Sequence, residues 1–238
     1  MIDLSSEAAA LEAALGPAYL GPAYRPGVGR VIQFVSAERG EGVSTVAREF
    51  ALHLAQTAAR GVWLVELDLM RGDQYASLAA DPERYGFLGS AVRATPNGEV
   101  FFKIEPPVRG VDGRPWADSR YLAAYPVGGR RWWVTRFRRE ALRTGQRAHV
   151  LGSPNYWDGL RRHADWVIVD CPAAERSRIV LATAAQMDAN VLVVSAEGGD
   201  ADRPPALRDA IVSAGGHCAG VFLNQVRTPA APFLRRFR

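Results

Sequence analysis

The sequence predicts an α/β fold in which a doubly wound, mostly parallel sheet is flanked by helices on both faces. Short runs rich in Val, Ile and Leu alternate with segments of helical spacing, and the runs are apolar at successive positions. Consecutive apolar residues are typical of strands buried on both faces, as in a parallel sheet that helices cover. The short connections between strands and helices favour the same open arrangement.

Five buried strands are expected from these runs, at residues 30–36, 62–67, 166–170, 190–196 and 219–224. Helical spacing predicts four helices, at 43–59, 153–164, 174–187 and 203–215. Residues 1–29 precede this pattern as an Ala-rich helix at 5–15 and a Pro/Gly linker, because Pro and Gly end a helix. We assign 30–227 to one domain and 228–238 to a basic tail.

Residues 94–147 interrupt the alternation and are rich in Gly, Pro, Arg and aromatic residues. We interpret them as an irregular or antiparallel insertion, with short strands at 99–104, 120–125 and 131–136; a disordered connector is the alternative. Within the insertion, GRRWWVTRFRRE interleaves Arg with Trp and Phe. An amphipathic edge strand packed on the domain is the favoured interpretation, a protein interface comes second, and stacking on single-stranded nucleic acid comes last.

Composition narrows the class of protein. The 238 residues are 48% hydrophobic, which is ordinary for a globular protein. The sequence has no run of about 18 apolar residues and no basic start before an apolar run, so we expect neither a transmembrane helix nor a signal peptide, and a cytoplasmic location. Cys171 and Cys218 are too few for a disulfide framework. The net charge of +4 is compatible with peripheral contact with an anionic membrane surface.

A Gly-rich turn, AERGEGVST at residues 37–45, joins the first strand to the first helix of the domain. A phosphate cradle needs backbone N–H groups at a helix N-terminus and small residues that permit close approach. Gly40 and Gly42 are the small residues, and Ser44 and Thr45 begin the helix. The Ser44 hydroxyl occupies the position of a Mg²⁺ ligand in a phosphate-binding loop.

The turn departs from the phosphate-loop pattern G-x-x-x-x-G-K-[ST], with Ala37 at the first Gly and Val43 at the Lys. A charge-assisted hydrogen bond to phosphate contributes about 1.5–3 kcal/mol, so loss of the Lys weakens nucleotide binding by about tenfold to a hundredfold. Loss of one donor to the transition state costs about 10²–10³ in rate. Arg39, Arg48 and Arg71 are candidate substitutes, and Arg39 is the best placed because it lies in the turn.

Two further predicted strands end in carboxylates. Asp68 follows VWLVEL, and Asp170 ends WVIVD. Because ligands of doubly wound sheets bind at the C-terminal ends of strands, we expect Ser44, Asp68 and Asp170 to meet at one site. Such a site suits phosphate, Mg²⁺ and an activated water, with the two acids as catalytic residues if the chain is active. Each Asp alone is better explained as a helix cap or a turn residue, but the three strand ends together favour the site.

The blocks VSAERGEGVST, LVELDLMRGDQ, WVIVDCPA, VLVVSAEGG and GVFLNQV, in this order, resemble the deviant Walker ATPases of the MinD/ParA superfamily, which have a P-loop NTPase fold. Over residues 30–92 and 148–227 the sequence looks most like the bacterial tyrosine autokinases of capsule and exopolysaccharide synthesis. The resemblance implies ATP or ADP with Mg²⁺ as ligand, and Asp68 and Asp170 as the Walker A′ and Walker B acids. It places Asn224 beside the adenine. The residues implied around the nucleotide are Gly40, Glu41, Gly42, Val43, Ser44, Thr45 and Asn224.

Several features that the resemblance associates with kinase activity are missing. Val43 replaces the Lys, and Glu66 stands where the A′ motif begins with Asp. The N-terminal helix SEAAALEAAL has no arginine for ring assembly, and the tail RTPAAPFLRRFR has no tyrosine. We therefore expect a catalytically impaired relative, a pseudokinase. It would act as a scaffold or regulatory partner of the cytosolic segment of a membrane polysaccharide export or co-polymerase protein.

Two other functions stay open at this point. The retained Ser44, Thr45 and two acids support an active but unusual ATPase, in which an Arg, or a basic residue from the second subunit of a homodimer, replaces the Lys. The second open function is that of a positioning or assembly protein of the MinD/ParA kind, which would bind membrane or DNA. A nucleic-acid partner is the least favoured of these, and peripheral contact with the inner membrane is compatible with all of them.

Overall fold

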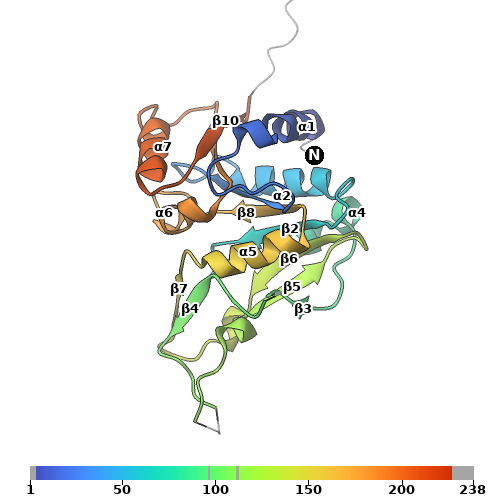
Figure 1. The fold of residues 1–238 in the computed structure, drawn as a ribbon, viewed down its shortest axis with the longest axis vertical. Helices are drawn as coiled ribbons and strands as arrows, with labels where there is room; N and C mark the ends of the chain where they lie inside the picture. Colours follow the sequence, from blue (N-terminus) through green and yellow to red (C-terminus); the bar gives the residue numbers. More distant parts are fainter. Residues whose placement is uncertain (1–3, 96, 111–112, 227–238) are drawn as a thin grey trace, which may run out of the picture.

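The computed structural model describes residues 4–95, 97–110 and 113–226. Its main sheet has the strand order β10-β9-β1-β8-β2-β6-β5-β3 (Figure 1). The strands are β1 (Arg30–Val35), β2 (Val62–Glu66), β3 (Val92–Arg93), β5 (Leu122–Pro126), β6 (Trp132–Phe137), β8 (Trp166–Asp170), β9 (Ala189–Ser195) and β10 (Cys218–Asn224). All five predicted strands are present, and every pairing from β10 to β6 is parallel. The predicted fold class is confirmed.

Helices cover both faces of this sheet. They are α1 (Ser5–Ala14), α2 (Val43–Leu54), α3 (Asp73–Ala80), α4 (Pro82–Tyr85), α5 (Pro154–His163), α6 (Ile179–Thr183) and α7 (Arg203–Ser213). Apolar side chains of α1 to α4 pack with one face of the strands, and those of α5 to α7 pack with the other. The alternating β-α chain therefore builds two apolar layers around one sheet, with the strand ends left at its edge.

The insertion is part of the sheet instead of a separate lobe. β6 lies beside β2 in parallel, with Val62 opposite Trp132, and β5 pairs with β6 in the antiparallel sense. A second, two-stranded antiparallel sheet is formed by β4 (Phe102–Glu105) and β7 (Arg147–Val150). Trp132 and Phe137, from the stretch that interleaves Arg with aromatic residues, are buried. The stretch therefore packs on the domain, as favoured, but as an interior strand and not at the edge.

The predicted helix at 174–187 is wrong as a continuous element. The N–H groups of Ala174 and Glu175 donate to the carbonyls of Ser36 and Ala37, at 2.9 and 3.2 Å. These bonds hold the chain after β8 against the turn that follows β1, so α6 begins only at Ile179. The short η4 (Ala184–Gln186) then follows α6 directly. The non-helical part of this segment lies beside the candidate phosphate site.

Three further differences concern helix ends and missed helices. α2 ends at Leu54 and not at residue 59, because Gln56 and Thr57 donate to carbonyls three residues back and tighten the chain into turns. α3 and α4 are not among the predicted helices. Both are short, and α3 depends on a contact to its first turn from Glu66, described below.

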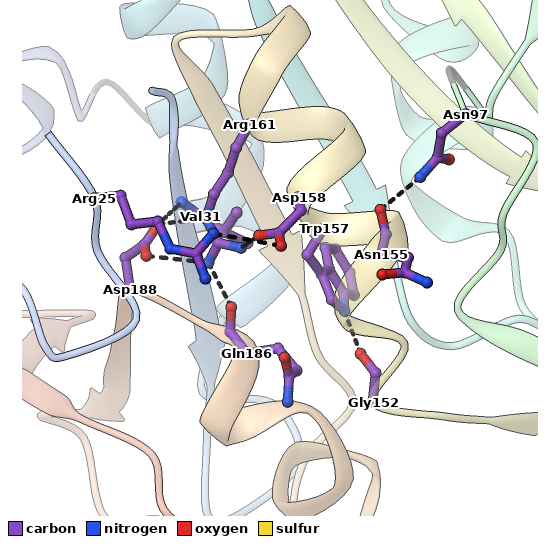
Figure 2. A network of polar contacts seen from close by, with 10 residues as sticks. All are labelled: Arg25, Val31, Asn97, Gly152, Asn155, Trp157, Asp158, Arg161, Gln186 and Asp188. Atoms are coloured by element: carbon purple, nitrogen blue, oxygen red, sulfur yellow. Dashed lines mark hydrogen bonds and ion pairs between the residues drawn. The ribbon is translucent and has the colours of Figure 1, made fainter. Parts of the chain in front are cut away.

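A buried ion pair on the α5 face ties three parts of the fold together (Figure 2). Arg161, on α5, contacts the Asp188 carboxylate through two nitrogens, at 3.0 and 3.2 Å. The same guanidinium donates to the Gln186 carbonyl at 2.6 Å and to Asp158 at 2.9 Å. Asp188 also accepts the Val31 N–H at 2.6 Å, where β1 begins. This network fixes α5 to the strands that lead into the site.

The N-terminal segment packs beside α2. Ala8 and Leu15 are buried in the same apolar layer as α2, and His53 of α2 lies 2.8 Å from the Glu12 carboxylate. None of the helices in the described part of the chain has the length and hydropathy needed to cross a bilayer. The predicted basic tail, 228–238, lies outside the described residues.

Candidate functional site

The turn between β1 and α2 has the backbone of a phosphate cradle. Gly40 and Gly42 have φ values of 86° and 87°, in the left-handed region that favours glycine. α2 starts directly after Gly42, and the first bonds of the turn run from the N–H groups of Thr45 and Val46 to the Gly42 carbonyl. The amides of Val43 and Ser44, at the start of α2, have no acceptor within the helix. They are available to an anion, as at other helix N-termini.

Contacts with the ends of β9 and β10 hold this turn in place. The buried Glu41 carboxylate accepts the N–H of Glu38 at 2.9 Å and that of Ser195 at 3.2 Å. Asn224 Nδ2 donates to the Glu41 carbonyl at 2.9 Å. A Cβ on Gly42 would lie 2.1 Å from the same Asn224 nitrogen, so the close approach requires glycine. The structure thus places Asn224, expected beside an adenine, against the backbone of the phosphate turn.

A cavity of about 290 Å³ opens at the ends of β1, β2 and β8. It contains all but one of the residues implied around the nucleotide, the exception being Asn224, and both predicted acids. Its lining consists of Ser36, Arg39, Gly40, Glu41, Gly42, Val43, Ser44, Thr45, Glu66, Asp68, Arg71, Asp73, Asp170, Cys171, Pro172, Ala173 and Arg176. None of the described residues of the insertion lines this cavity. The topology therefore brings the Gly-rich turn and the two acids to one place, as expected for a doubly wound sheet.

Val43 stands at the head of α2, where a phosphate loop carries its lysine. It is 8% exposed and belongs to the apolar layer that also contains Val46, Ala47 and Phe50. The side chain lines the cavity but offers neither charge nor a hydrogen-bond donor. Any phosphate held here is therefore bound by backbone amides and by arginines from elsewhere.

Asp170 is buried at the end of β8 and is fixed by polar neighbours. Gln74 Nε2 donates to its carboxylate at 2.7 Å and to the Ser44 carbonyl at 2.8 Å. Burial raises the pKa of Asp170 to about 6, against the hydrogen bonds from Gln74 and from the Ser44 hydroxyl, which lower it. The Ser44 hydroxyl and the Asp170 carboxylate are thus neighbours, as a shared role toward Mg²⁺ requires.

Glu66, at the end of β2, caps α3. Its two carboxylate oxygens accept the N–H groups of Asp73 at 2.8 Å and Gln74 at 3.2 Å. Burial, followed by the nearby negative charge of Asp170, raises the pKa of Glu66 to about 8. This acid therefore orients α3, and through α3 it positions Gln74 against Asp170.

Asp68 faces a cation that the sequence analysis did not single out. Arg176, in the chain after β8, places Nη1 3.0 Å from Asp68 Oδ2. The approach lacks hydrogen-bond geometry, so Oδ2 is a buried atom without a hydrogen-bond partner among the described residues. The proposed Walker A′ acid is thus held in an ion pair, and one of its oxygens is left with unused acceptor capacity.

The three candidate substitutes for the lysine have different positions. Arg39 and Arg71 line the cavity, and Arg71 Nη1 lies 3.4 Å from Asp73. Arg48 is not in the lining; it donates to Tyr85 at 3.2 Å and to Gln74 at 3.0 Å. With Arg176, three arginines line the phosphate cavity.

The donors fit a Mg²⁺ ion that is bound together with a phosphate. Magnesium in nucleotide sites rests on one or two carboxylates, substrate phosphates and water. Ser44, Asp68 and Asp170 line the same cavity and supply that kind of donor. Across the described ranges no cluster of three or more His, Cys, Asp or Glu is arranged to hold a metal, so an all-protein metal site finds no support there.

Two residues of the site escaped the sequence analysis. Gln74 lies in the quoted block LVELDLMRGDQ, but its role depends on α3, which was not predicted. Arg176 lies where a continuous helix was expected, and the helix would have hidden its approach to Asp68. A polar residue with no exposed surface, such as Gln74, is recognisable only when its partners are known.

Comparisons with known proteins agree with this geometry. No protein-family model matches the sequence, and no curated protein matches it significantly. Among solved structures, the chimerical protein CapA2B2 aligns at TM-score 0.56 and 16% identity, over 85% of this chain and 79% of that one. The kinase domain of the Escherichia coli tyrosine kinase ETK aligns at TM-score 0.54 and 16% identity, over 94% and 74%.

A third structure, the BceF tyrosine kinase domain, aligns at TM-score 0.52 and 19% identity, over 94% of this chain and 76% of that one. At identities this low the likeness establishes the fold. The alignments span most of the chain. This chain therefore shares its fold with these tyrosine kinase domains.

Proposed function

We propose that this protein is a catalytically impaired relative of the tyrosine autokinases of exopolysaccharide biosynthesis. It acts as a scaffold or regulatory partner of the cytosolic segment of a membrane polysaccharide co-polymerase. The observation that carries this proposal is Val43, an apolar residue packed at the head of α2, where a phosphate-binding loop carries its lysine. The kinase domains that share the fold support the choice of family.

The remaining chemistry favours weak binding over phosphoryl transfer. Backbone amides at the start of α2 can hold a phosphate, but no side chain there supplies the charge that the β/γ oxygens gain in the transition state. Asp68, the acid expected to assist the reaction, is paired with Arg176. A nucleotide would then serve to order the site, while its turnover is lost.

Incubation of the purified protein with ATP and Mg²⁺ tests this proposal. We expect no phosphotyrosine, because the substitution at Val43 removes a transition-state donor. Thermal unfolding with millimolar ADP and Mg²⁺ measures binding separately: a ligand at 100 times its Kd stabilises by about 2.7 kcal/mol, a shift of several degrees. Autophosphorylation on tyrosine would overturn the proposal. A stable complex with the cytosolic co-polymerase segment, retained without nucleotide, is the positive result.

One observation supports a second candidate, an unusual ATPase. Arg39 and Arg176 both line the cavity, and either could donate to a phosphate in place of the lysine. This function requires ATP hydrolysis that disappears in Asp68→Ala and that Arg39→Ala or Arg176→Ala weakens. Equal rates in the wild type and in Asp68→Ala would reject it, because the hydrolysis would then come from a contaminant.

A further inference from the structure

A second hollow, of about 550 Å³, lies in the insertion. The small sheet of the insertion, β4 and β7, lies away from α1 and α7 (Figure 1). The charged and aromatic lining of the hollow consists of Arg109, Arg114, Trp116, Arg120 and Arg143, and we call this hollow the arginine pocket. It shares no lining residue with the phosphate cavity. Nothing in the proposed function uses it.

The arginine pocket has a charge of one sign. Among the described residues, the four charged side chains that line it are all arginines, and none of the lining residues is a carboxylate. The insertion as a whole, 94–147, has eleven basic and five acidic residues, a net charge of +6 in a chain whose total is +4. The positive charge of the protein is therefore concentrated in the part of the chain that the nucleotide-binding blocks do not require.

Two of these arginines contact the same aromatic ring. The guanidinium carbons of Arg120 and Arg143 lie 4.8 and 5.1 Å from the centre of the Trp116 ring. Cation–π attraction favours each contact, while the two like charges repel one another. Among the described residues no carboxylate forms an ion pair with either arginine. An anion bound in the hollow that both line would offset their like charge.

Backbone and amide bonds fix both sides of the pocket. The Trp116 N–H donates to the Val108 carbonyl at 2.7 Å and the Gly110 N–H donates to that of Arg114 at 2.8 Å, which closes a hairpin. On the other side, the Arg143 N–H donates to Gln146 Oε1 at 2.9 Å, and Gln146 Nε2 donates to Pro106 at 2.8 Å. The single Gln146 side chain therefore ties the Arg143 turn to the start of the hairpin. The arginines project from a preorganised frame.

We propose that the arginine pocket binds a compact phosphate ester or pyrophosphate. Guanidinium forks match the geometry of phosphate oxygens, and clustered arginines are the usual means of binding multiply charged phosphates. The hollow has the size of a small-molecule site. A concave site suits a compact anion better than a flat membrane surface or an extended nucleic-acid strand does. A soluble ester and a lipid headgroup share this chemistry of recognition, and the vesicle experiment below separates them.

The indole N–H resonance of Trp116 reports on this pocket alone. It can be followed by NMR during titration with inorganic pyrophosphate, and Trp116→Phe assigns it among the six tryptophans. We expect a saturable shift of this resonance. Arg120→Gln combined with Arg143→Gln should weaken the pyrophosphate affinity by about tenfold or more, because both removed groups are charged donors.

A matched pair of substitutions controls for bulk charge. Arg130→Gln combined with Arg147→Gln removes the same charge from exposed positions of the insertion outside the lining, and should change the affinity by less than about twofold. Equal weakening by both pairs, or no saturable shift at 10 mM pyrophosphate, would overturn the proposal. Unchanged thermal unfolding of the Arg120/Arg143 variant shows that the fold is intact.

Vesicle binding separates the two sources of phosphate. Flotation with phosphatidylglycerol in phosphatidylcholine vesicles that requires Arg120 and Arg143 identifies a lipid headgroup. Pyrophosphate binding without such flotation identifies a soluble ester. If both pairs of substitutions weaken flotation equally, the vesicles bind through bulk charge, and this result contradicts binding in the arginine pocket. The phosphate turn shares no lining residue with the arginine pocket, and Trp116 lines only the arginine pocket. A negative result in these experiments therefore does not contradict the proposed function, and failure of the proposed function does not contradict binding in the arginine pocket.

Discussion

Arg176 and Asp68 form an ion pair across the candidate phosphate cavity, with Nη1 3.0 Å from Oδ2. The pair joins the end of β2 to the chain that follows β8, so it connects two of the strands that build the site. Both side chains line the cavity. A phosphate must compete with Asp68 for Arg176, and a magnesium ion must compete with Arg176 for Asp68. The ion pair therefore couples the binding of the two.

Replacement of Arg176 by Gln should uncouple them. We expect ADP affinity without Mg²⁺ to fall by about tenfold, because a cation within reach of the phosphates is lost. The ratio of affinities with and without Mg²⁺ should rise, since Asp68 is then free to bind the ion. Calorimetric titration with ADP, with and without Mg²⁺, measures both. Arg178→Gln, two residues along and exposed, is the control and should leave the ratio unchanged.

Replacement of Val43 by Lys should restore a donor to the phosphate turn. The first turn of α2 already has the backbone of the cradle, so the new ammonium group needs only to extend into the cavity that Val43 lines. We expect ADP affinity in the presence of Mg²⁺ to rise by about tenfold to a hundredfold. Val43→Met introduces an apolar side chain about as long as that of lysine, and it should give no gain in ADP affinity. An equal gain in both variants would show that side-chain length, and not charge, limits binding.

The sequence predicted the parallel core because its signals are local. Val-Ile-Leu runs identify β1, β2, β8, β9 and β10, and strand ends identify Asp68 and Asp170. Carboxyl ends of parallel strands meet at one edge, so the cavity followed from the topology. The position of β6 did not follow, because parallel pairing with β2 spans about seventy residues and leaves no local mark.

The remaining site residues depend on tertiary contacts that override local preference. Residues 174–187 have helical spacing, yet Ala174 and Glu175 bond to the chain after β1 and stop the helix from forming there. This break is what exposes Arg176 to Asp68. Gln74 looks like an ordinary polar residue in sequence and becomes informative only once Asp170 is seen beside it. Propensity alone cannot register either effect.

Glu66 makes the stability of the protein depend on pH. Its pKa is raised from 4.5 to about 8 in the folded protein, so the folded state holds this proton more tightly than the unfolded chain does. The stability that Glu66 contributes is complete below about pH 4.5 and is lost as the pH rises through 8. Asp170, with a pKa of about 6, contributes in the same direction over a narrower range.

Glu66→Gln should therefore flatten the pH dependence of the unfolding free energy between pH 4.5 and 8, because the amide keeps an acceptor for the first turn of α3 but does not titrate. Urea denaturation at a series of pH values measures the slope. Glu83→Gln, at an exposed position of α4, is the matched control and should retain the wild-type slope. An unchanged slope in Glu66→Gln would assign the pH dependence to other groups.

The buried pair of Arg161 and Asp188 should be the most sensitive structural contact outside the site (Figure 2). Asp188 has no exposed surface, and Arg161 supplies two of its contacts. Arg161→Met keeps the apolar stem but leaves the carboxylate without its cation, and only the Val31 N–H remains as a described donor. We expect a loss of about 3–5 kcal/mol in unfolding free energy, because an unpaired buried charge is costly.

Two further variants decide whether the cost comes from the stranded charge. Arg162→Met changes the exposed neighbour on the same helix and should alter the unfolding free energy by less than about 0.5 kcal/mol. Asp188→Asn in the Arg161→Met background removes the charge while it keeps an acceptor for Val31, and should recover part of the loss. If the double variant is no more stable than Arg161→Met, the loss comes from the other hydrogen bonds of the Arg161 guanidinium, to Asp158 and the Gln186 carbonyl, and not from the unpaired charge of Asp188.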